Sequence, residues 1–235
     1  MNNKVKTGFL SGHFSRLLTS LVLLFLLRPY TSGLLYRGGW HTLLTFVFIS
    51  SIFHANHNKK IKTVSISLAI PSVILFWTDL FFPSKTLFAL ATILTAVFMF
   101  MLVYSIMKRV LLEASVTLET LRGAICAYLL IAFAFACIYT FIEVVFPGSF
   151  SYGAHSLDLG GNYNFFSWIL YFSFVTLLTI GYGDLTPLNS FSQSFSILEG
   201  IVGQFYVAML VSRLIAVYSP SSKNNILKSQ RNNRS

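Results

Sequence analysis

The hexapeptide Thr179-Ile180-Gly181-Tyr182-Gly183-Asp184 lies between two long apolar stretches of the chain. Its two glycines stand at alternate positions, and glycine reaches positive φ without steric cost. If alternate residues take such backbone angles, the carbonyls of Thr179, Ile180, Gly181 and Tyr182 form a column of oxygens, which the Thr179 hydroxyl extends. Stacked rings of backbone carbonyls can replace the water of a dehydrated cation. We therefore expect a metal-coordinating backbone here, with the Ile180 and Tyr182 side chains pointing away from the oxygens.

The stretch before the hexapeptide, residues 165–178, holds only apolar and hydroxyl side chains. As a helix it would be about 21 Å long, too short for a hydrocarbon core of about 30 Å. It suits a re-entrant helix, and residues 147–164, with Asp158 as their only charged group, suit an extracellular turret. Irregular backbone at membrane depth is tolerated only where protein buries it or it lines a water-filled path. The hexapeptide would be that backbone.

Composition also indicates a membrane protein. Of 235 residues, 55% are hydrophobic and 10% charged, with a mean hydropathy of +0.71, whereas soluble domains carry roughly 25% charged residues. The net charge of +10 would indicate a nucleic-acid partner in a soluble protein. Here the basic residues flank apolar stretches, so no nucleic-acid partner is expected.

Apolar stretches predict an all-α membrane protein with six transmembrane helices, near 9–27, 39–55, 62–82, 86–107, 121–146 and 191–218. The first follows Lys4 and Lys6, as in a signal peptide, but no small-residue cleavage site comes after it, so an uncleaved anchor is expected.

The distribution of basic residues predicts that both termini are cytoplasmic. With that orientation, only Arg28, Arg37 and Lys85 of the 17 Lys and Arg residues lie outside, as the positive-inside rule requires. A small chain with a basic cytoplasmic face and no eukaryotic trafficking signal suggests a bacterial inner membrane.

Residues from about 120 to 218 resemble the pore module of tetrameric potassium channels, of the prokaryotic, six-helix type. The resemblance rests on an outer helix, a turret, the octapeptide YFSFVTLL (171–178), the hexapeptide as selectivity filter, Pro187 and an inner helix. It implies a homotetramer with K+ as the permeant ion, passive conduction, and no organic substrate. The dipole of the re-entrant pore helix would point its negative end toward a central cavity.

Three residues depart from the family pattern. Leu178 replaces a frequent threonine, Phe172 replaces a residue that hydrogen-bonds the filter tyrosine, and Val175 stands where some members have a carboxylate. Tyr171 could still donate a hydrogen bond to Asp184. A weakly selective monovalent cation channel, or a non-conducting scaffold or regulatory subunit, are the alternatives.

Other residues are candidate supports of the filter. Gly183, Asp184, Tyr171 and Thr176 are assigned to it by position. Glu199, an acid inside the last apolar stretch, is a functional candidate by default: it could brace the filter through a hydroxyl such as Thr176, or face the cavity and concentrate cations.

Gly203, in the same stretch as Glu199, aligns with the family's hinge glycine, but a glycine there could equally serve close helix packing. Val207, Leu210 and Val211 lie below it and could line the lower pore.

The remaining sequence predicts three parts: a four-helix membrane domain (1–110), a pore domain (111–218) and a short basic cytoplasmic tail (219–235) that attracts anionic lipid. Residues 86–107 contain no Lys or Arg, and a voltage sensor needs several, so a voltage-insensitive channel is expected. The chain has no nucleotide-binding loop or catalytic constellation, so we expect no enzyme.

Overall fold

A computed structural model describes residues 13–26, 41–42, 44–49, 59–82, 84–112, 117–152, 155–156 and 164–218. The helices are α1 (His13–Leu26), α3 (Lys59–Phe81), α4 (Lys85–Leu112), α5 (Leu118–Val145), α6 (Asn164–Leu177) and α7 (Ser190–Tyr218). Residues 41–42 and 44–49 are also helical. The strands are β1 (Phe150–Tyr152), β2 (His155–Ser156) and β3 (Leu185–Pro187).

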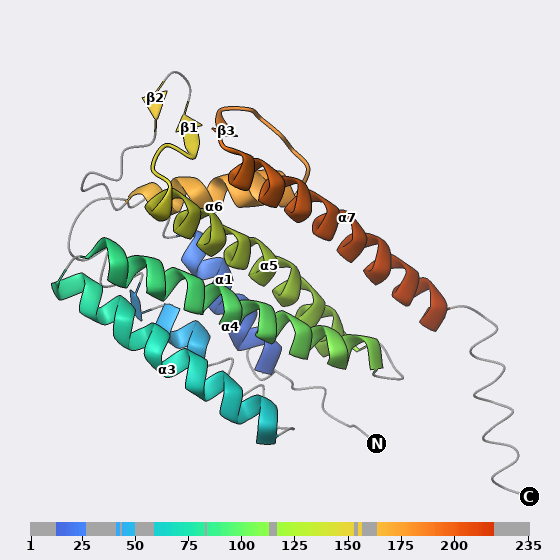
Figure 1. Cartoon of the computed structure of the whole chain (residues 1–235). Coiled ribbons are helices and arrows are strands. Elements are labelled where there is room, and N and C mark those ends of the chain that lie inside the picture. The colour runs from blue at the N-terminus through green and yellow to red at the C-terminus, as the bar shows by residue number, and fades with distance from the viewer. Residues whose placement is uncertain are drawn as a thin grey trace, which may run out of the picture.

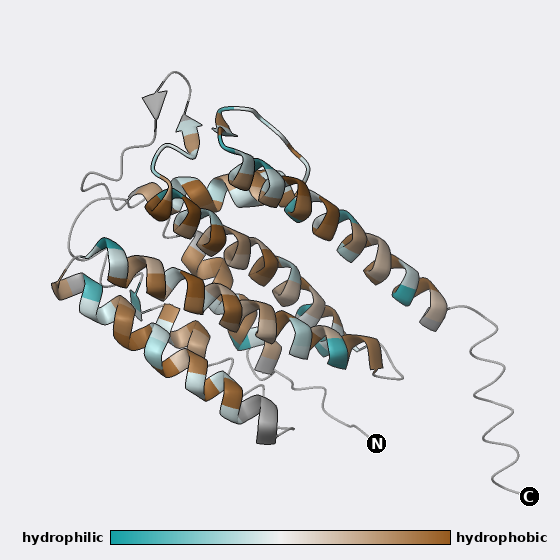
Figure 2. Ribbon diagram, viewed as in Figure 1, coloured by the Kyte–Doolittle hydropathy of each residue, from teal (hydrophilic) through white to brown (hydrophobic). Residues whose placement is uncertain are grey.

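Within these described residues, three helical stretches are long and apolar enough to cross a membrane: Lys85–Leu112, Leu118–Val145 and Ser190–Ala216. Apolar side chains cover most of their length (Figure 2). The apolar parts of α1 and α3 are shorter, at Phe14–Leu24 and Thr63–Asp79. Most of the predicted second span (39–55), the start of the first and the predicted tail (219–235) lie outside the described residues. The protein is therefore mostly helical with membrane-length helices, and six spans stay a prediction.

Helix α5 is the centre of the molecule (Figure 1). Helix α4 runs beside it, which the short connection at residues 113–117 requires, and α1, α6 and α7 also pack against it. Small side chains, which let neighbouring helices approach closely, recur along α5 at Ala124, Ala127, Ala132, Ala134 and Ala136, all buried. The core therefore surrounds α5, and α7 lies at its edge.

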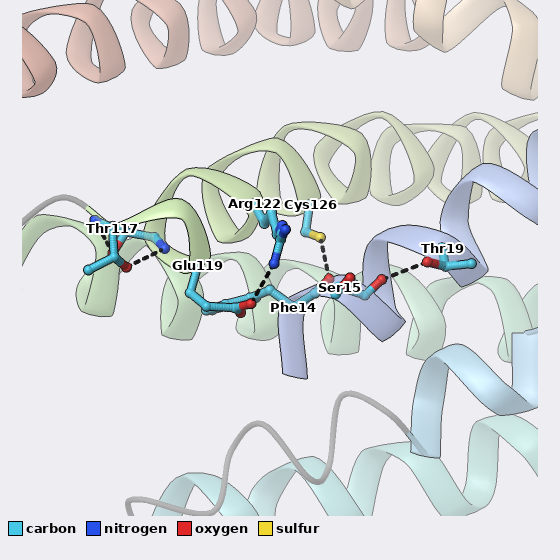
Figure 3. A network of polar contacts seen from close by, with 8 residues as sticks. Phe14, Ser15, Thr19, Thr117, Glu119, Arg122 and Cys126 are labelled. Atoms are coloured by element: carbon cyan, nitrogen blue, oxygen red, sulfur yellow. Dashed lines mark hydrogen bonds and ion pairs between the residues drawn. The ribbon is translucent and has the colours of Figure 1, made fainter. Parts of the chain in front are cut away.

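The first turn of α1 contacts α5 at Cys126, close to the polar groups at the start of α5 (Figure 3). The Cys126 thiol donates to the Phe14 carbonyl at 3.6 Å, and the Arg109 guanidinium lies 5.6 Å from the centroid of the Phe14 ring. A Cβ on Gly123 would come within 2.8 Å of that ring, so a larger residue here would displace Phe14. Thr117 caps α5 with a capping box. Helix α1 is thus held at the junction of α4 and α5.

A three-stranded antiparallel sheet, which the sequence analysis does not predict, lies at the opposite end of α5 (Figure 1). The strand order is β2-β1-β3, and Phe150 pairs with Pro187 while Tyr152 pairs with Leu185. The sheet therefore joins the first part of the predicted turret to the segment that follows the hexapeptide. Residues 153–154 and 157–163 of that turret lie outside the described part of the chain.

Candidate functional site

The hexapeptide leaves α6 with alternating backbone conformations. Thr179, Gly181 and Gly183 have φ of +55°, +63° and +76°, so every second residue lies in the left-handed region. Glycine adopts this region freely, but a β-branched residue such as Thr179 rarely does and is strained there. The Ile180 and Tyr182 side chains are 47% and 67% exposed in the single chain. Backbone strain and exposed apolar groups are thus concentrated on one short loop.

The end of α6 holds this loop through its last carbonyls, which have no partner within a helix. Phe174 O accepts from Leu178 N at 2.9 Å, Val175 O from Ile180 N at 2.9 Å, and Thr176 O from Thr179 N at 3.0 Å. The remaining carbonyl, that of Leu177, accepts from the Tyr128 hydroxyl at 3.2 Å. Three of the four carbonyls therefore bind the entering loop, and the fourth binds a side chain of α5.

Tyr171 contacts the loop in two ways. Its hydroxyl donates to Asp184 Oδ2 at 2.8 Å, the hydrogen bond that the sequence led us to expect. Its ring stacks on Tyr182, with centroids 6.4 Å apart and planes at 8°. Phe172, in contrast, packs away from the loop against Tyr139 and Phe150, with both centroid distances 5.3 Å. One aromatic residue of α6 thus contacts both Tyr182 and Asp184.

Replacing Tyr171 with phenylalanine separates these two contacts, because the ring remains while the donor to Asp184 is lost. We expect a loss of about 1 kcal/mol of stability per chain, seen as a lower thermal unfolding midpoint of the purified protein in detergent. Tyr104→Phe, at an exposed position on α4, is the control and should leave the midpoint unchanged. Equal midpoints for both variants would contradict a stabilising role of the hydrogen bond.

Glu199 is 0% exposed and joins three helices. Its Oε2 accepts from the Tyr139 hydroxyl of α5 at 2.7 Å, and its Oε1 makes a short hydrogen bond with Ser173 Oγ of α6. Ser173 Oγ also lies 2.7 Å from the Ala132 carbonyl. Thr176 was named as an example of such a hydroxyl, and the α6 hydroxyl that bonds to Glu199 in the structure is that of Ser173. Complete burial against α5 and α6 favours bracing over a cavity-facing charge.

The cluster around Glu199 has to supply a hydrogen to each of its hydrogen-bond acceptors. Ser173 has one hydroxyl hydrogen, yet both Glu199 Oε1 and Ala132 O are within hydrogen-bond distance. If Glu199 were protonated, it would donate to Ser173, which would leave the Ser173 hydrogen for Ala132 O while Tyr139 donates to the second carboxyl oxygen. In that arrangement every hydroxyl hydrogen of the cluster has an acceptor.

Gly203 lies against the end of α6. An added Cβ would come within 2.7 Å of Leu177 O and 2.9 Å of Leu177 Cδ1, and α7 continues as one helix through this position. Gly203 was interpreted either as a hinge or as a close-packing residue. The short distances to Leu177 give a structural reason for close packing. Farther along, Val207 and Val211 are exposed in the single chain, whereas Leu210 packs against the chain's own core.

Glu143, a site that the sequence analysis missed, holds the turret side. This buried carboxylate near the end of α5 accepts from Gly148 N at 2.7 Å and from Phe150 N at 3.0 Å. Nearby, Ser149 O accepts from Leu188 N at 2.8 Å and from Ser192 Oγ at 3.0 Å. An acid inside an apolar stretch is the signal that could have identified Glu143. Glu143 thus fixes the start of the turret to α5, and Ser149 joins that start to the segment around the beginning of α7.

The comparisons with known proteins cover the same part of the chain. Residues 125–219 match an ion channel family model. This ion-channel region begins within α5 and ends just after α7, so it contains α6, the hexapeptide and the sheet. Its match, together with the membrane-length helices, supports a membrane protein of the ion-channel type.

Two relatives carry potassium channels in their names. Two-pore potassium channel 2 of Arabidopsis thaliana is 38% identical over 63 residues, which are 27% of this chain and 14% of that protein. Two pore potassium channel c of Oryza sativa subsp. japonica is 33% identical over 113 residues, 46% of this chain and 24% of that protein. The chain therefore spans a quarter or less of the length of these relatives. No solved structure matches. The findings support the potassium channel family.

Proposed function

We propose that this protein is a potassium-selective channel in which K+ passes along the carbonyls of Thr179, Ile180, Gly181 and Tyr182 and the Thr179 hydroxyl. The observation that carries the proposal is the positive φ of Thr179, Gly181 and Gly183. When left-handed and right-handed backbone conformations alternate along a chain, successive carbonyls lie on the same side of it. Such carbonyl oxygens select K+. A strained threonine persists only where the surrounding structure imposes it, and the hydrogen bonds from α6 supply that constraint.

A homotetramer follows from the coordination of the ion, because one chain supplies only one wall of a cage of oxygens. The exposure of α7 supports association: 17% of its apolar stretch is buried within the chain, against 72% for α5. The large exposed side chains of α7 include Ile197, Ile201 and Phe205. In the proposed assembly, the hexapeptides surround a common axis and α7 lies on the inner side.

The rest of the chain is proposed to form a peripheral domain and a tail. Residues 1–110 form the voltage-insensitive membrane domain, since α4 carries no basic residue from Thr86 to Met107. Residues 111–218 form the pore, and the tail at 219–235 contacts anionic lipid. Both termini face the cytoplasm, and the host membrane is a bacterial inner membrane. Passive transport without catalysis or organic substrate is the proposed activity.

The weakly selective cation channel is a second candidate because of two particular residues. Leu178 offers no hydroxyl at the inner end of the loop and is exposed in the single chain. Phe172 gives Tyr182 no hydrogen-bond partner, since it packs against Tyr139 and Phe150. Both features reduce the number of polar contacts that hold the loop. Neither of them removes a carbonyl from the proposed column.

Purified protein in planar bilayers tests these candidates directly. With K+ on one side and an equal concentration of Na+ on the other, the expected reversal potential lies far from zero, because it is set by the ratio of K+ to Na+ permeability. Ba2+, a divalent ion with nearly the radius of K+, is expected to block the current. A reversal potential near zero would favour the weakly selective channel. Bilayers without any cation current would favour the non-conducting scaffold or regulatory subunit.

A further inference from the structure

The carbonyl of Leu177 is the last of α6 and the one that the loop does not satisfy. Leu178, Thr179 and Ile180 direct their N–H groups to the three preceding carbonyls. Leu177 itself is 1% exposed, so its carbonyl depends on the Tyr128 hydroxyl at 3.2 Å. Buried carbonyls without a partner are costly. Tyr128 therefore acts as a side-chain cap at the C-terminus of the short helix before the hexapeptide.

Helix α7 holds Tyr128 in place. The Tyr206 ring lies against the Tyr128 ring, with centroids 5.2 Å apart and planes at 37°. The Tyr206 hydroxyl donates to the Ala124 carbonyl, one helical turn before Tyr128 on α5. Tyr206 is buried, whereas Tyr128 is partly buried. The Tyr206 ring, which a phenylalanine would keep, is thus the part of α7 that contacts Tyr128, while the Tyr206 hydroxyl is bonded to α5.

The same carbonyl is confined from the other side by Gly203. An added Cβ would lie 2.7 Å from Leu177 O, whereas a Cβ on Gly200, one turn earlier on α7, would meet no atom within 4 Å. Gly203 therefore leaves the space that the Leu177 carbonyl occupies. Two helices, α5 and α7, together determine where the end of α6 lies.

We propose that Tyr128 is a positioning residue for the filter: its hydroxyl caps α6 at Leu177 and thereby fixes the entry of the chain into Thr179. This assignment rests on the proposed function. Leu177 is two residues before Thr179, so a carbonyl that turns to find another donor rotates the backbone that carries the first coordinating group. Tyr128 touches no ion and acts only through this backbone.

The test compares Tyr128→Phe with Tyr206→Phe. Each variant loses one hydroxyl from the same pair of rings. The Tyr128 hydroxyl donates to a carbonyl of α6, whereas the Tyr206 hydroxyl donates to a carbonyl of α5. K+ binding is measured by isothermal titration of the full-length protein in detergent, exchanged from Na+ to K+. We expect Tyr128→Phe to weaken K+ binding on the order of tenfold, since a buried carbonyl loses its partner, and to lower the K+ over Na+ permeability ratio in bilayers. Tyr206→Phe should keep the wild-type ion affinity and ratio.

A second pair approaches the same carbonyl from α7. Gly203→Ala displaces Leu177 O and should weaken K+ binding as Tyr128→Phe does, while Gly200→Ala should not. If Tyr128→Phe does not assemble, the comparison of Gly203→Ala with Gly200→Ala tests whether the position of the Leu177 carbonyl affects K+ binding.

Two results would overturn the assignment while the channel itself stands: wild-type K+ affinity in Tyr128→Phe and Gly203→Ala, or an equal loss in Tyr206→Phe. A wild-type protein that neither binds nor conducts K+ would refute the proposed function and the assignment with it.

Discussion

We expect alanine at Gly181 to abolish K+ flux through the reconstituted protein and to leave its helices intact. Gly181 has φ of +63°, and an added Cβ would meet no atom within 4 Å, so backbone conformation and not space is the obstacle. The left-handed region costs an L-residue about 1–2 kcal/mol, and the proposed tetramer would bear this four times. Rotation of the peptide relieves the strain but turns a carbonyl out of the column. The measurement is K+ flux from loaded liposomes, with circular dichroism to follow helix content.

Gly148→Ala is the matched control for this substitution. Gly148 also has positive φ, +83°, and free space for a Cβ, but it lies in the turret, outside the hexapeptide. Both variants carry comparable backbone strain, so only Gly181→Ala should lose flux. Undiminished flux in Gly181→Ala would mean that this carbonyl column is not the ion path.

Glu199 should tolerate glutamine and not alanine. The glutamine amide can donate to Ser173 and accept from Tyr139, reproducing the pattern of a neutral acid. Alanine leaves the buried Tyr139 hydroxyl without its acceptor and opens a cavity between three helices, at a cost of about 1–3 kcal/mol per chain for the hydroxyl alone. We expect Glu199→Ala to lower the unfolding midpoint and to lose most of the flux, while Glu199→Gln retains both.

Single-channel conductance at low K+ separates bracing from electrostatic attraction. If Glu199 braces the filter, Glu199→Gln conducts as the wild type does. A marked fall in the conductance of Glu199→Gln, with a normal unfolding midpoint, would instead assign Glu199 to a cavity-facing charge that concentrates cations.

Helix boundaries of the pore region could be predicted closely from the sequence, because apolar runs end at recognisable residues. The re-entrant helix was expected at 165–178 and is observed at Asn164–Leu177; the last helix was expected at 191–218 and is observed at Ser190–Tyr218. At the latter, Asn189 Oδ1 accepts from Ser192 N at 2.7 Å, a side-chain cap that sets where the helix begins. The Tyr171–Asp184 pair was also foreseen, from the resemblance to a known family.

Contacts between helices could not be predicted in the same way. Ser173 and Thr176 are one turn apart on α6, and only the rotation of that helix against α5 and α7 brings Ser173 to Glu199. The caps from Tyr128 and Glu143 join residues to backbone groups whose positions follow from the folded chain. Gly203 has the same sequence signature whether it serves as a hinge or as a packing residue, and the 2.7 Å between an added Cβ and Leu177 O gives a reason for close packing that the sequence does not show. The turret strands are too short to leave a clear pattern.

Within one chain, the α6 carbonyls, Tyr171 and the pairing of β1 with β3 already hold the hexapeptide and its flanks. Biogenesis can therefore proceed in two steps. In the proposed tetramer, a newly inserted subunit would acquire this segment before it meets another copy, so docking would have little conformational entropy left to remove. Oligomer formation would then be the association of subunits that are already folded. Its rate should depend on the subunit concentration in the bilayer more than on any further folding.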